Sequence, residues 1–434
     1  MSDGNDRYRK ETRLIHGKKR SLHWSYKDHI VPPISASVAY RLETTERGAE
    51  GFREFANPEF NRELTPPIYI YDRLDEPGRG MLEENLKMVE GGESCVAFAT
   101  GMAAISAALG VILKAGDTLI SHKTIYGCTF SLFNNWFPRL GIKVRFIDLT
   151  DPGNLEELLR KDSGVMAIFG ETPCNPTLEV LDLQAITDIV KTHNAKRPPR
   201  RQVFTVIDNT FATPFCQRPI EHGVDIVVNS LTKNIGGFGT DMGGAVIAPK
   251  LIEPDLLLYR KDFGAALAPK AAWPPLVYGL PTLPMRTLQQ MKTASRIAQF
   301  LEQHPMVQRV SYPGLPSHPQ HEIAKRQMRD FDDRFAPGTM VYFNLRGNAE
   351  EVRQRGARIM DILEKDALTT TLAVSLGQIR TLIEHPASMT HAALPQAVQE
   401  KVGVEPGGIR ISVGLEHADD LINDFAMSLD AARN

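Results

Sequence analysis

Cysteine is scarce in this chain, which has four cysteines and three tryptophans among its 434 residues. The cysteines, at positions 95, 128, 174 and 216, lie far apart and form no Cys-x-x-Cys pair. This spacing argues against a disulfide framework and against a zinc site built from cysteines. We therefore expect reduced thiols, a cytoplasmic location and no bound metal.

The chain also lacks an excess of charge and a long apolar run. Its formal net charge is −2, which argues against a general nucleic-acid-binding surface. The short basic run Lys18-Lys19-Arg20 fits a solvated N-terminal arm. No apolar run approaches the length of a membrane span, and the N-terminus has no apolar signal core. We expect neither nucleic acid nor a membrane as a partner.

What the chain does have is enough apolar sequence, 42% of its residues, to bury a large core. Residues 80 to about 250 alternate β-branched runs with helical stretches, which indicates an α/β fold with a mostly parallel sheet. A proline-rich passage, 269–284, precedes a helix predicted from about 285 to 303, and strands at 339–345 and 409–413 indicate a smaller α+β domain. We predict an N-terminal arm over 1–75, a cofactor-binding domain over 76–283 and a C-terminal domain over 284–434.

A lysine follows the apolar run at 225–229 after a short spacer. In Ser230-Leu231-Thr232-Lys233, two hydroxyls stand three residues and one residue before the amine. Such an amine can form a Schiff base with an aldehyde cofactor, and the hydroxyls can donate to its phosphate. The run at 203–207 ends in Asp208, which can pair with a protonated pyridine nitrogen. Each residue alone could be a solvated lysine or a helix cap; together they favour pyridoxal phosphate.

Three further segments also follow predicted strands. Gly101, after the run at 94–98, opens a small-residue helix predicted from 102 to 113, where free N–H groups and the helix dipole can attract a phosphate. Tyr126 could stack on a flat ring, although a buried core position is the commoner fate of such a tyrosine. Asn175, between two prolines, could reach a ring hydroxyl. Because ligands bind at the carboxyl ends of parallel strands, we expect these segments to converge on one crevice.

Several short motifs, found in order, resemble the Cys/Met-metabolism family of fold-type-I pyridoxal phosphate enzymes. This family includes cystathionine γ-synthase, cystathionine γ-lyase, methionine γ-lyase and O-acylhomoserine sulfhydrylases. The resemblance runs from about residue 68 to the C-terminus. The motifs are Tyr71-Asp72-Arg73, Thr100 to Ala104, Asp208 to Phe211, Ser230 to Lys233, Ser375-Leu376-Gly377, His385 to His391 and Arg410 to Gly414.

The resemblance implies a role in cofactor binding for each of these positions. Lys233 would be the Schiff-base lysine, Asp208 would pair with the pyridine nitrogen, and Tyr126 would stack on the ring. Asn175 would bond the ring hydroxyl. The phosphate would be held by Gly101, Met102, Ser230 and Thr232, and by Tyr71 and Arg73 of a neighbouring subunit.

The same resemblance implies how substrate is bound and how the chain assembles. Arg410 would clamp the carboxylate of an amino-acid substrate in a two-pronged pair, and Ser375 would steady Lys233 or the substrate. Tyr126 would protonate the leaving group. Because the phosphate contacts from Tyr71 and Arg73 cross between subunits, the active unit would be a homodimer, usually paired into a homotetramer.

The chain departs from the family pattern near the expected site. The family usually has Gly-His-Ser-Asp, Asn-Pro-Thr and Arg-Gly-Leu where this chain has Gly237 to Asp241, Glu76-Pro77-Gly78 and Tyr278-Gly279-Leu280. The segment 46–67 looks longer than usual and could reshape the mouth of the site. Arg380 replaces a common acid: it either faces the pocket, where it would repel the cationic tail of cystathionine, or it lies on the surface.

Residues that differ between the enzymes of this family favour an elimination reaction. Cys128 and the pair Lys261-Asp262 resemble methionine γ-lyase, in which a cysteine lies near the substrate's sulfur, whereas Val374 stands where cystathionine γ-lyases often carry glutamate. The alternative for Cys128 is a small packed thiol. We predict γ-elimination on a sulfur-containing or other homoserine-derived amino acid, giving a 2-oxo acid, ammonia and the leaving group. γ-Replacement, a non-sulfur leaving group and a catalytically idle fold are the alternatives.

Overall fold

The computed structural model describes residues 8–16, 26, 28–60, 65, 67–389, 399 and 404–433. The basic run Lys18-Lys19-Arg20 lies outside the described residues. So do residues 61–64 and 66 of the long segment, and Thr390 and His391 of the motif that begins at His385.

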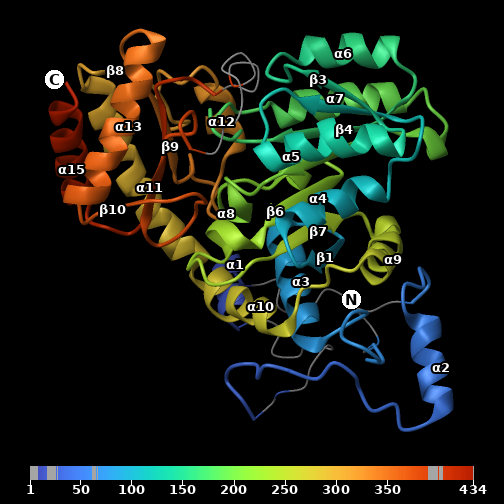
Figure 1. The fold of residues 1–434 in the computed structure, drawn as a ribbon. Coiled ribbons are helices and arrows are strands. Elements are labelled where there is room, and N and C mark those ends of the chain that lie inside the picture. Colours follow the sequence, from blue (N-terminus) through green and yellow to red (C-terminus); the bar gives the residue numbers. More distant parts are fainter. Residues whose placement is uncertain are drawn as a thin grey trace.

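A seven-stranded sheet forms the centre of the larger lobe (Figure 1). β7 runs antiparallel to both of its neighbours, and every other neighbouring pair is parallel. This confirms the mostly parallel α/β arrangement expected from the sequence. In spatial order the strands are β1 (Ser94–Phe98), β7 (Gly244–Ala248), β6 (Ile226–Ser230), β5 (Phe204–Asp208), β4 (Val165–Glu171), β2 (Thr118–His122) and β3 (Lys143–Ile147).

Helices cover both faces of this sheet, which is why most of its strand residues are buried. Every residue of β1, β2, β4 and β7 is buried. Leu82 and Leu86 of α3 pack in one core cluster, and Ala104 and Leu256, from α4 and α9, pack in another. The helices of this lobe are α3 (Pro77–Glu90), α4 (Gly101–Gly110), α5 (Gly127–Ser131), α6 (Pro152–Lys161), α7 (Leu183–Asn194), α8 (Thr213–Cys216), α9 (Glu253–Phe263) and α10 (Pro269–Pro274).

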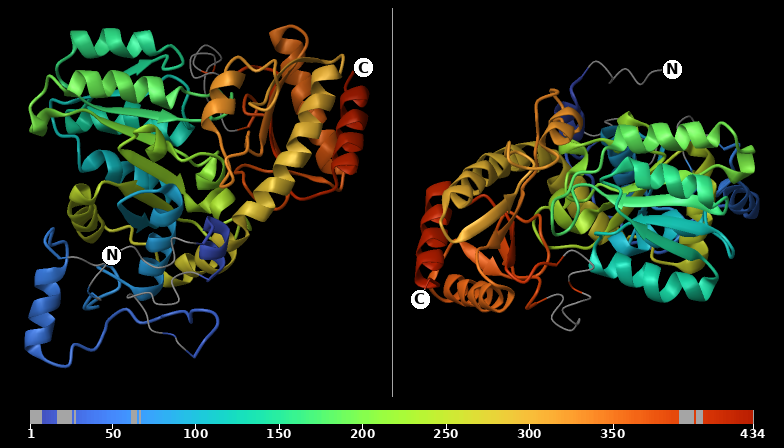
Figure 2. Two further views of the ribbon diagram at one scale, coloured as in Figure 1. Left: turned by 180° about the vertical axis from the view of Figure 1, so that it is seen from behind. Right: turned by 90° about the horizontal axis from the view of Figure 1, so that it is seen from above.

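A five-stranded sheet forms a second, smaller lobe beside the first (Figure 2). Its strands, in spatial order, are β10 (Thr370–Leu372), β11 (Thr381–Glu384), β12 (Gly408–Ser412), β9 (Met340–Leu345) and β8 (Val307–Ser311). β10 and β11 are parallel and the other neighbours are antiparallel. Its helices are α11 (Leu280–Gln303), α12 (His321–Gln327), α13 (Ala349–Asp366) and α15 (Ala418–Ala431). This is the α+β arrangement expected for the C-terminal part.

The proline-rich passage is helical rather than a spacer. A π-helix, η7 (Pro275–Gly279), joins α10 to α11, which begins at Leu280 and not near residue 285. Side chains use backbone carbonyls in this stretch: Thr282 Oγ1 donates to the Tyr278 carbonyl at 2.6 Å, and Arg286 Nη2 donates to the Gly279 carbonyl at 2.8 Å. These bonds occupy acceptors in a segment whose prolines supply no N–H.

The two helices of the N-terminal part lie differently. α1 (Lys10–His16) lies against the lobes, with Leu14 buried in the core cluster that includes α3, whereas α2 (Thr45–Glu54) projects away from them (Figure 1). Ile30, Val38 and Phe52 expose more than half of their surface. None of the described helices combines the length and the apolar character that a membrane span requires.

Candidate active site

Three polar residues end neighbouring parallel strands, and the candidate site is built on them. Glu171 is the last residue of β4, Asp208 of β5 and Ser230 of β6. Glu171 and Asp208 are direct partners in the register of their strands. The predicted convergence at the carboxyl ends of the strands is therefore present in the structure.

Lys233 lies in a short π-helix, η5 (Leu231–Ile235), and leaves helical geometry with φ −94° and ψ −137°. Its Nζ donates a hydrogen bond of 2.6 Å to Ser375 Oγ. The pKa of Lys233 is lowered to about 8, mainly by burial and secondly by the positive charge of Arg410. An amine with this pKa is neutral far more often at physiological pH than an exposed lysine is. Ser375 has a φ of 87°, which is strained for a residue with a side chain.

The start of α4 lies against the end of β6, as a phosphate cradle requires. Thr100 Oγ1 caps the helix by accepting from the Ala103 N–H at 3.0 Å, while the first N–H groups of a helix have no partner within it. A Cβ on Gly101 would lie 2.9 Å from Ser230 Cβ, so only glycine permits this approach. Thr232 Oγ1 accepts from the Gly243 N–H at 3.1 Å.

Two other predicted residues flank these groups. Met102 is partly buried, and its sulfur lies 3.9 Å from Thr129 Oγ1. Tyr126 precedes α5 with 43% of its surface exposed. Burial, followed by the Cys128 side chain, raises the pKa of Tyr126. Cys128 is exposed and close enough to Lys233 to influence its pKa as well.

Asp208 and Glu171 form a pair of buried carboxyl groups. Asp208 Oδ1 accepts from the Thr210 N–H at 2.9 Å, and Glu171 Oε1 accepts from the Tyr126 N–H at 2.8 Å. Burial raises the pKa of Asp208, and burial together with Asp208 raises the pKa of Glu171 well above its usual range. The protonated form of Glu171 is therefore favoured more strongly than that of Asp208, and a cation beside Asp208 would favour the charged form of that residue. The sequence interpretation did not assign a role to Glu171.

Arg410 connects the small lobe to this site. The side chain is 6% exposed; Nη1 donates to Asn175 Oδ1 at 3.0 Å, and Nη2 donates to the Ser375 carbonyl at 2.9 Å. Nη2 also forms an ion pair with Glu384 on the neighbouring strand. The structure therefore brings together Lys233, Ser375, Asn175 and Arg410 as expected, and adds Glu384, which sequence reasoning missed.

Tyr71 and Arg73 make their contacts elsewhere. Tyr71 is 40% exposed and bridges to Ala39 of the arm, and the Arg73 guanidinium lies 5.7 Å from the centre of the Tyr71 ring. Arg73 Nη1 donates to the carbonyl of Lys261 in α9. Neither of these contacts involves the residues grouped around Lys233 in the same chain.

One departure from the family pattern, residues 237–241, falls on a tightly packed loop. Gly237 and Gly239 have φ of 77° and 71°, and a Cβ on Gly237 would collide with Arg286. The guanidinium of Arg286 lies 5.4 Å from the centre of the Phe238 ring. Arg380 is exposed, which favours the surface alternative for that residue.

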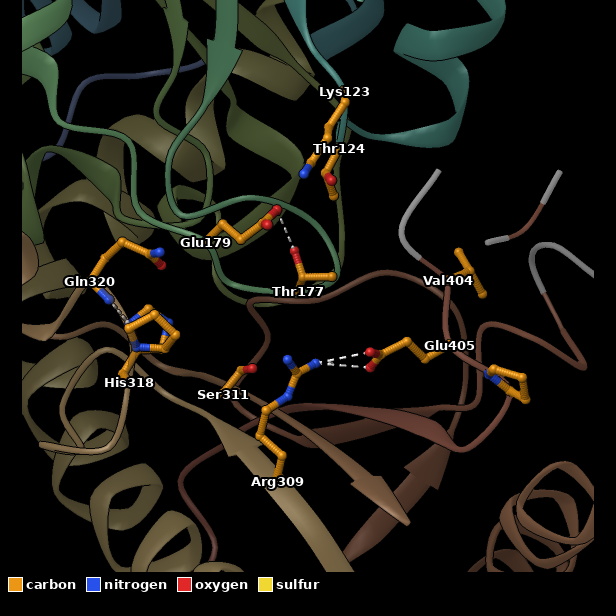
Figure 3. Close-up of a pocket in the computed structure, with 12 residues that line it drawn as sticks. Lys123, Thr124, Thr177, Glu179, Arg309, Ser311, His318, Gln320, Val404 and Glu405 are labelled. Atoms are coloured by element: carbon orange, nitrogen blue, oxygen red, sulfur yellow. Dashed lines mark hydrogen bonds and ion pairs between the residues drawn. The ribbon is translucent and has the colours of Figure 1, made fainter. Parts of the chain in front are cut away.

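A separate pocket of about 390 Å³ lies between the lobes (Figure 3). Its charged side chains already have partners: Arg309 Nη2 donates to both carboxylate oxygens of Glu405 at 3.0 Å, and Thr177 Oγ1 donates to Glu179 at 3.0 Å. Lys233 does not line this pocket, which is bounded by Lys123, Thr124, Thr177, Glu179, Arg309, Ser311, His318, Pro319, Gln320, Val404, Glu405 and Pro406.

Beside this pocket, ligand atoms of His122, Cys174 and Glu179 lie within 4.8 Å of one another. His122 Nδ1 accepts from the Leu149 N–H at 3.0 Å, so a neutral ring carries its proton on Nε2, 3.5 Å from Glu179. The thiol of Cys174 donates to the Glu171 carbonyl at 2.9 Å. Because a metal-binding imidazole needs a free nitrogen, these bonds describe a hydrogen-bonded cluster better than a metal site.

Known proteins resemble the chain over most of its length. The family model described as Cys/Met metabolism PLP-dependent enzyme matches residues 11–430. L-methionine gamma-lyase of Fusobacterium nucleatum subsp. polymorphum is 38% identical over 403 residues, covering 92% of this chain and 93% of the relative. Cystathionine beta-lyase of Coxiella burnetii is 39% identical over 364 residues, covering 83% and 87%.

Solved structures agree with these relatives. The crystal structure of cystathionine gamma synthase from Xanthomonas oryzae pv. oryzae in complex with aminoacrylate and cysteine matches with a TM-score of 0.82. It is 32% identical and the match covers 98% of each chain. The fold is therefore the fold-type-I arrangement of these enzymes, and the chain belongs to the Cys/Met-metabolism family of pyridoxal phosphate-dependent enzymes.

Proposed function

We propose that this enzyme catalyses γ-elimination on methionine or a similar homoserine-derived amino acid, releasing a 2-oxo acid, ammonia and a thiol. The observation that carries the proposal is the grouping of Lys233, Ser375 and Arg410 with Cys128 beside Tyr126. The similarity to several L-methionine gamma-lyases at 34–38% identity supports it.

The residues present fit the family's cofactor. Gly101 lets the start of α4 approach Ser230 closely, which leaves helix N–H groups for a phosphate. Asp208 is a partly buried carboxyl that can face a ring nitrogen, and Lys233 is a partly buried amine of lowered pKa that can bond an aldehyde carbon. When bound, pyridoxal phosphate supplies an electron sink for negative charge that develops on the substrate carbons.

Each protein group then has a specific task. Lys233 Nζ takes the proton from the substrate α-carbon, and its hydrogen bond to Ser375 Oγ keeps the amine directed. Arg410 holds the substrate carboxylate, which orients the bond to be broken. A tyrosine hydroxyl is protonated at neutral pH, so Tyr126 has a proton that it can deliver to the departing sulfur.

The substrate screen that tests this proposal measures 2-oxobutyrate release from methionine, cystathionine and O-acetylhomoserine, each with and without an added thiol. We expect methionine to give the highest kcat/KM without thiol, since Val374, next to Ser375, offers no acid for a distal amine. Thiol-dependent consumption of O-acetylhomoserine without 2-oxobutyrate would contradict elimination. It would support γ-replacement, the alternative favoured by the likeness to a cystathionine gamma synthase.

We also propose that the active unit is a homodimer or homotetramer in which Tyr71 and Arg73 contact the phosphate bound by a neighbouring subunit. Tyr71 and Arg73 are exposed, and the arm also exposes apolar residues; both observations support this sharing. The thiols of all four cysteines are free, which supports a reducing cytoplasmic location.

We further propose, from the sequence pattern, that the chain divides into an arm (1–75), a cofactor-binding domain (76–283) and a C-terminal domain (284–434). The boundary between the second and third parts falls within the first turn of α11.

Arg73→Ala tests the sharing of sites. Loss of one charge-assisted phosphate contact, worth about 1.5–3 kcal/mol, should weaken cofactor affinity tenfold or more. Arg73→Ala chains and Lys233→Ala chains can be unfolded, mixed and refolded together. Part of the activity should then return, because a hybrid dimer keeps one site with both residues intact. A fully active wild-type monomer in sedimentation analysis would rule the sharing out.

A further inference from the structure

Arg410 already has a carboxylate partner within the chain. Glu384 ends β11 and stands directly opposite Arg410 in the antiparallel register with β12. The two side chains form an ion pair, and both are buried, Glu384 with 2% of its surface exposed. Water screens the attraction between two such buried charges little, although burying them costs desolvation free energy.

The hydrogen bonds of Arg410 leave limited room for a second carboxylate. A guanidinium carries two N–H groups on each terminal nitrogen and one on Nε. Nη2 donates to Glu384 and to the Ser375 carbonyl, and Nη1 donates to Asn175. A carboxylate can pair with two N–H groups of a guanidinium either through Nη1 and Nη2 or through Nε and Nη2. Both arrangements use an N–H of Nη2. Because Nη2 already donates to Glu384 and to the Ser375 carbonyl, a further carboxylate can bind in this way only if one of these bonds is released.

We propose that Glu384 is an internal counter-ion that competes with the substrate's α-carboxylate for Arg410 and thereby sets how tightly the site holds carboxylates. The proposal rests on the role of Arg410 given under the proposed function. Glu384 is a positioning and affinity-determining residue: it touches Arg410 rather than the reacting atoms. Its negative charge repels an incoming carboxylate at short range, whereas a neutral amide of the same shape would not be repelled.

This arrangement suits a reaction whose substrate and product both carry a carboxylate. Tight binding of both would lower KM without speeding the chemical step, and would slow product release. If the Glu384 carboxylate binds Arg410 again as the product leaves, product release becomes faster. The charge of Glu384 should therefore raise KM and the inhibition constants of carboxylates, and have less effect on kcat.

Glu384→Gln is the direct test, because it keeps the shape and one oxygen acceptor for Arg410 but removes the charge. In the cofactor-loaded enzyme we expect the inhibition constant of butyrate to fall about tenfold, and KM for the amino-acid substrate to fall more than kcat changes. Butyrate should also raise the melting temperature more in the variant than in the wild type. Butyramide, which has no charge, should act alike on both.

Glu83→Gln is the matched control. Glu83 pairs with the buried Arg260 at 2.6 Å, so this variant also loses the charge of a buried arginine–carboxylate pair. It should lower the melting temperature while leaving the inhibition constant of butyrate unchanged. A fall in that constant in both variants would assign the effect to general loosening and overturn the proposal.

The outcomes separate this inference from the proposed function. If Arg410→Ala abolishes butyrate inhibition but Glu384→Gln leaves it unchanged or weaker, Glu384 does not compete and only this inference fails. If Arg410→Ala leaves butyrate inhibition unchanged, the role of Arg410 itself is wrong. Should Glu384→Gln not fold, Glu384→Asp serves, since its shorter side chain uncovers Arg410 in part; butyrate must then bind more tightly than in the wild type, and equal binding overturns the proposal.

Discussion

Lys233→Ala should abolish turnover and remove the yellow colour of the purified enzyme, an absorbance at about 420 nm that a cofactor bonded to lysine produces. The same amine bonds the cofactor and takes the substrate's α-proton, so its removal should cost on the order of 10⁴-fold or more in kcat. The lowered pKa of Lys233, caused first by burial and then by Arg410, suits both tasks. The measurement is an absorbance spectrum together with single-substrate kinetics.

Ser375→Ala is the matched control for that experiment. It removes only the oxygen 2.6 Å from Lys233 Nζ, so the colour should persist while kcat falls by about tenfold, the value of one hydrogen bond to a charged group. A yellow and active Lys233→Ala protein would refute the assignment of Lys233. A colourless wild type that gains no band with added pyridoxal phosphate would refute the whole interpretation of the site.

Sequence reasoning located the strands of the large sheet well, for a physical reason. Strands buried on both faces are short apolar runs bounded by turns, so the predicted run at 94–98 coincides with β1, and the run at 203–207 is displaced by one residue from β5. Because the ends of parallel strands meet at one edge, the grouping of Asp208 with Ser230 followed from the order of their strands alone.

Helical structure in the proline-rich passage could not be predicted in the same way. Proline disfavours helix interiors in general. Pro281 is nevertheless allowed because it lies in the first turn of α11, where a backbone N–H has no partner within the helix, while Pro284 lies farther inside. Arg286 fixes this helix against η5, because its Nη1 donates to the Asn234 carbonyl at 3.0 Å. A local reading of sequence contains no sign of that long-range contact.

Glu384 was missed because its role depends on strand register. In sequence it is one acidic residue at the end of an apolar run, 26 residues before Arg410. Only the antiparallel pairing of β11 with β12 sets the two side chains opposite each other. Motif matching identified Arg410 and Ser375 individually, whereas the charge balance around Arg410 needed the folded sheet.

Asp208→Asn should reduce kcat/KM on the order of 10³-fold while much of the cofactor stays bound. The carboxylate of Asp208 is buried at the end of β5 and stabilises positive charge on the ring nitrogen; a neutral amide cannot do so in a site of low polarity. Lys233 and the groups of the phosphate cradle remain in place. Kinetics should therefore be measured beside cofactor content and melting temperature.

Glu171→Gln distinguishes the charge of Asp208 from its shape. Glu171 is the register partner of Asp208, and burial, with the charge of Asp208 as the second cause, raises its pKa, which favours the uncharged form. Its amide replacement should then cost about tenfold at most, through the hydrogen bond from the Tyr126 N–H. Equal losses in the two variants would mean that packing at the strand ends, and not the negative charge at Asp208, supports the reaction.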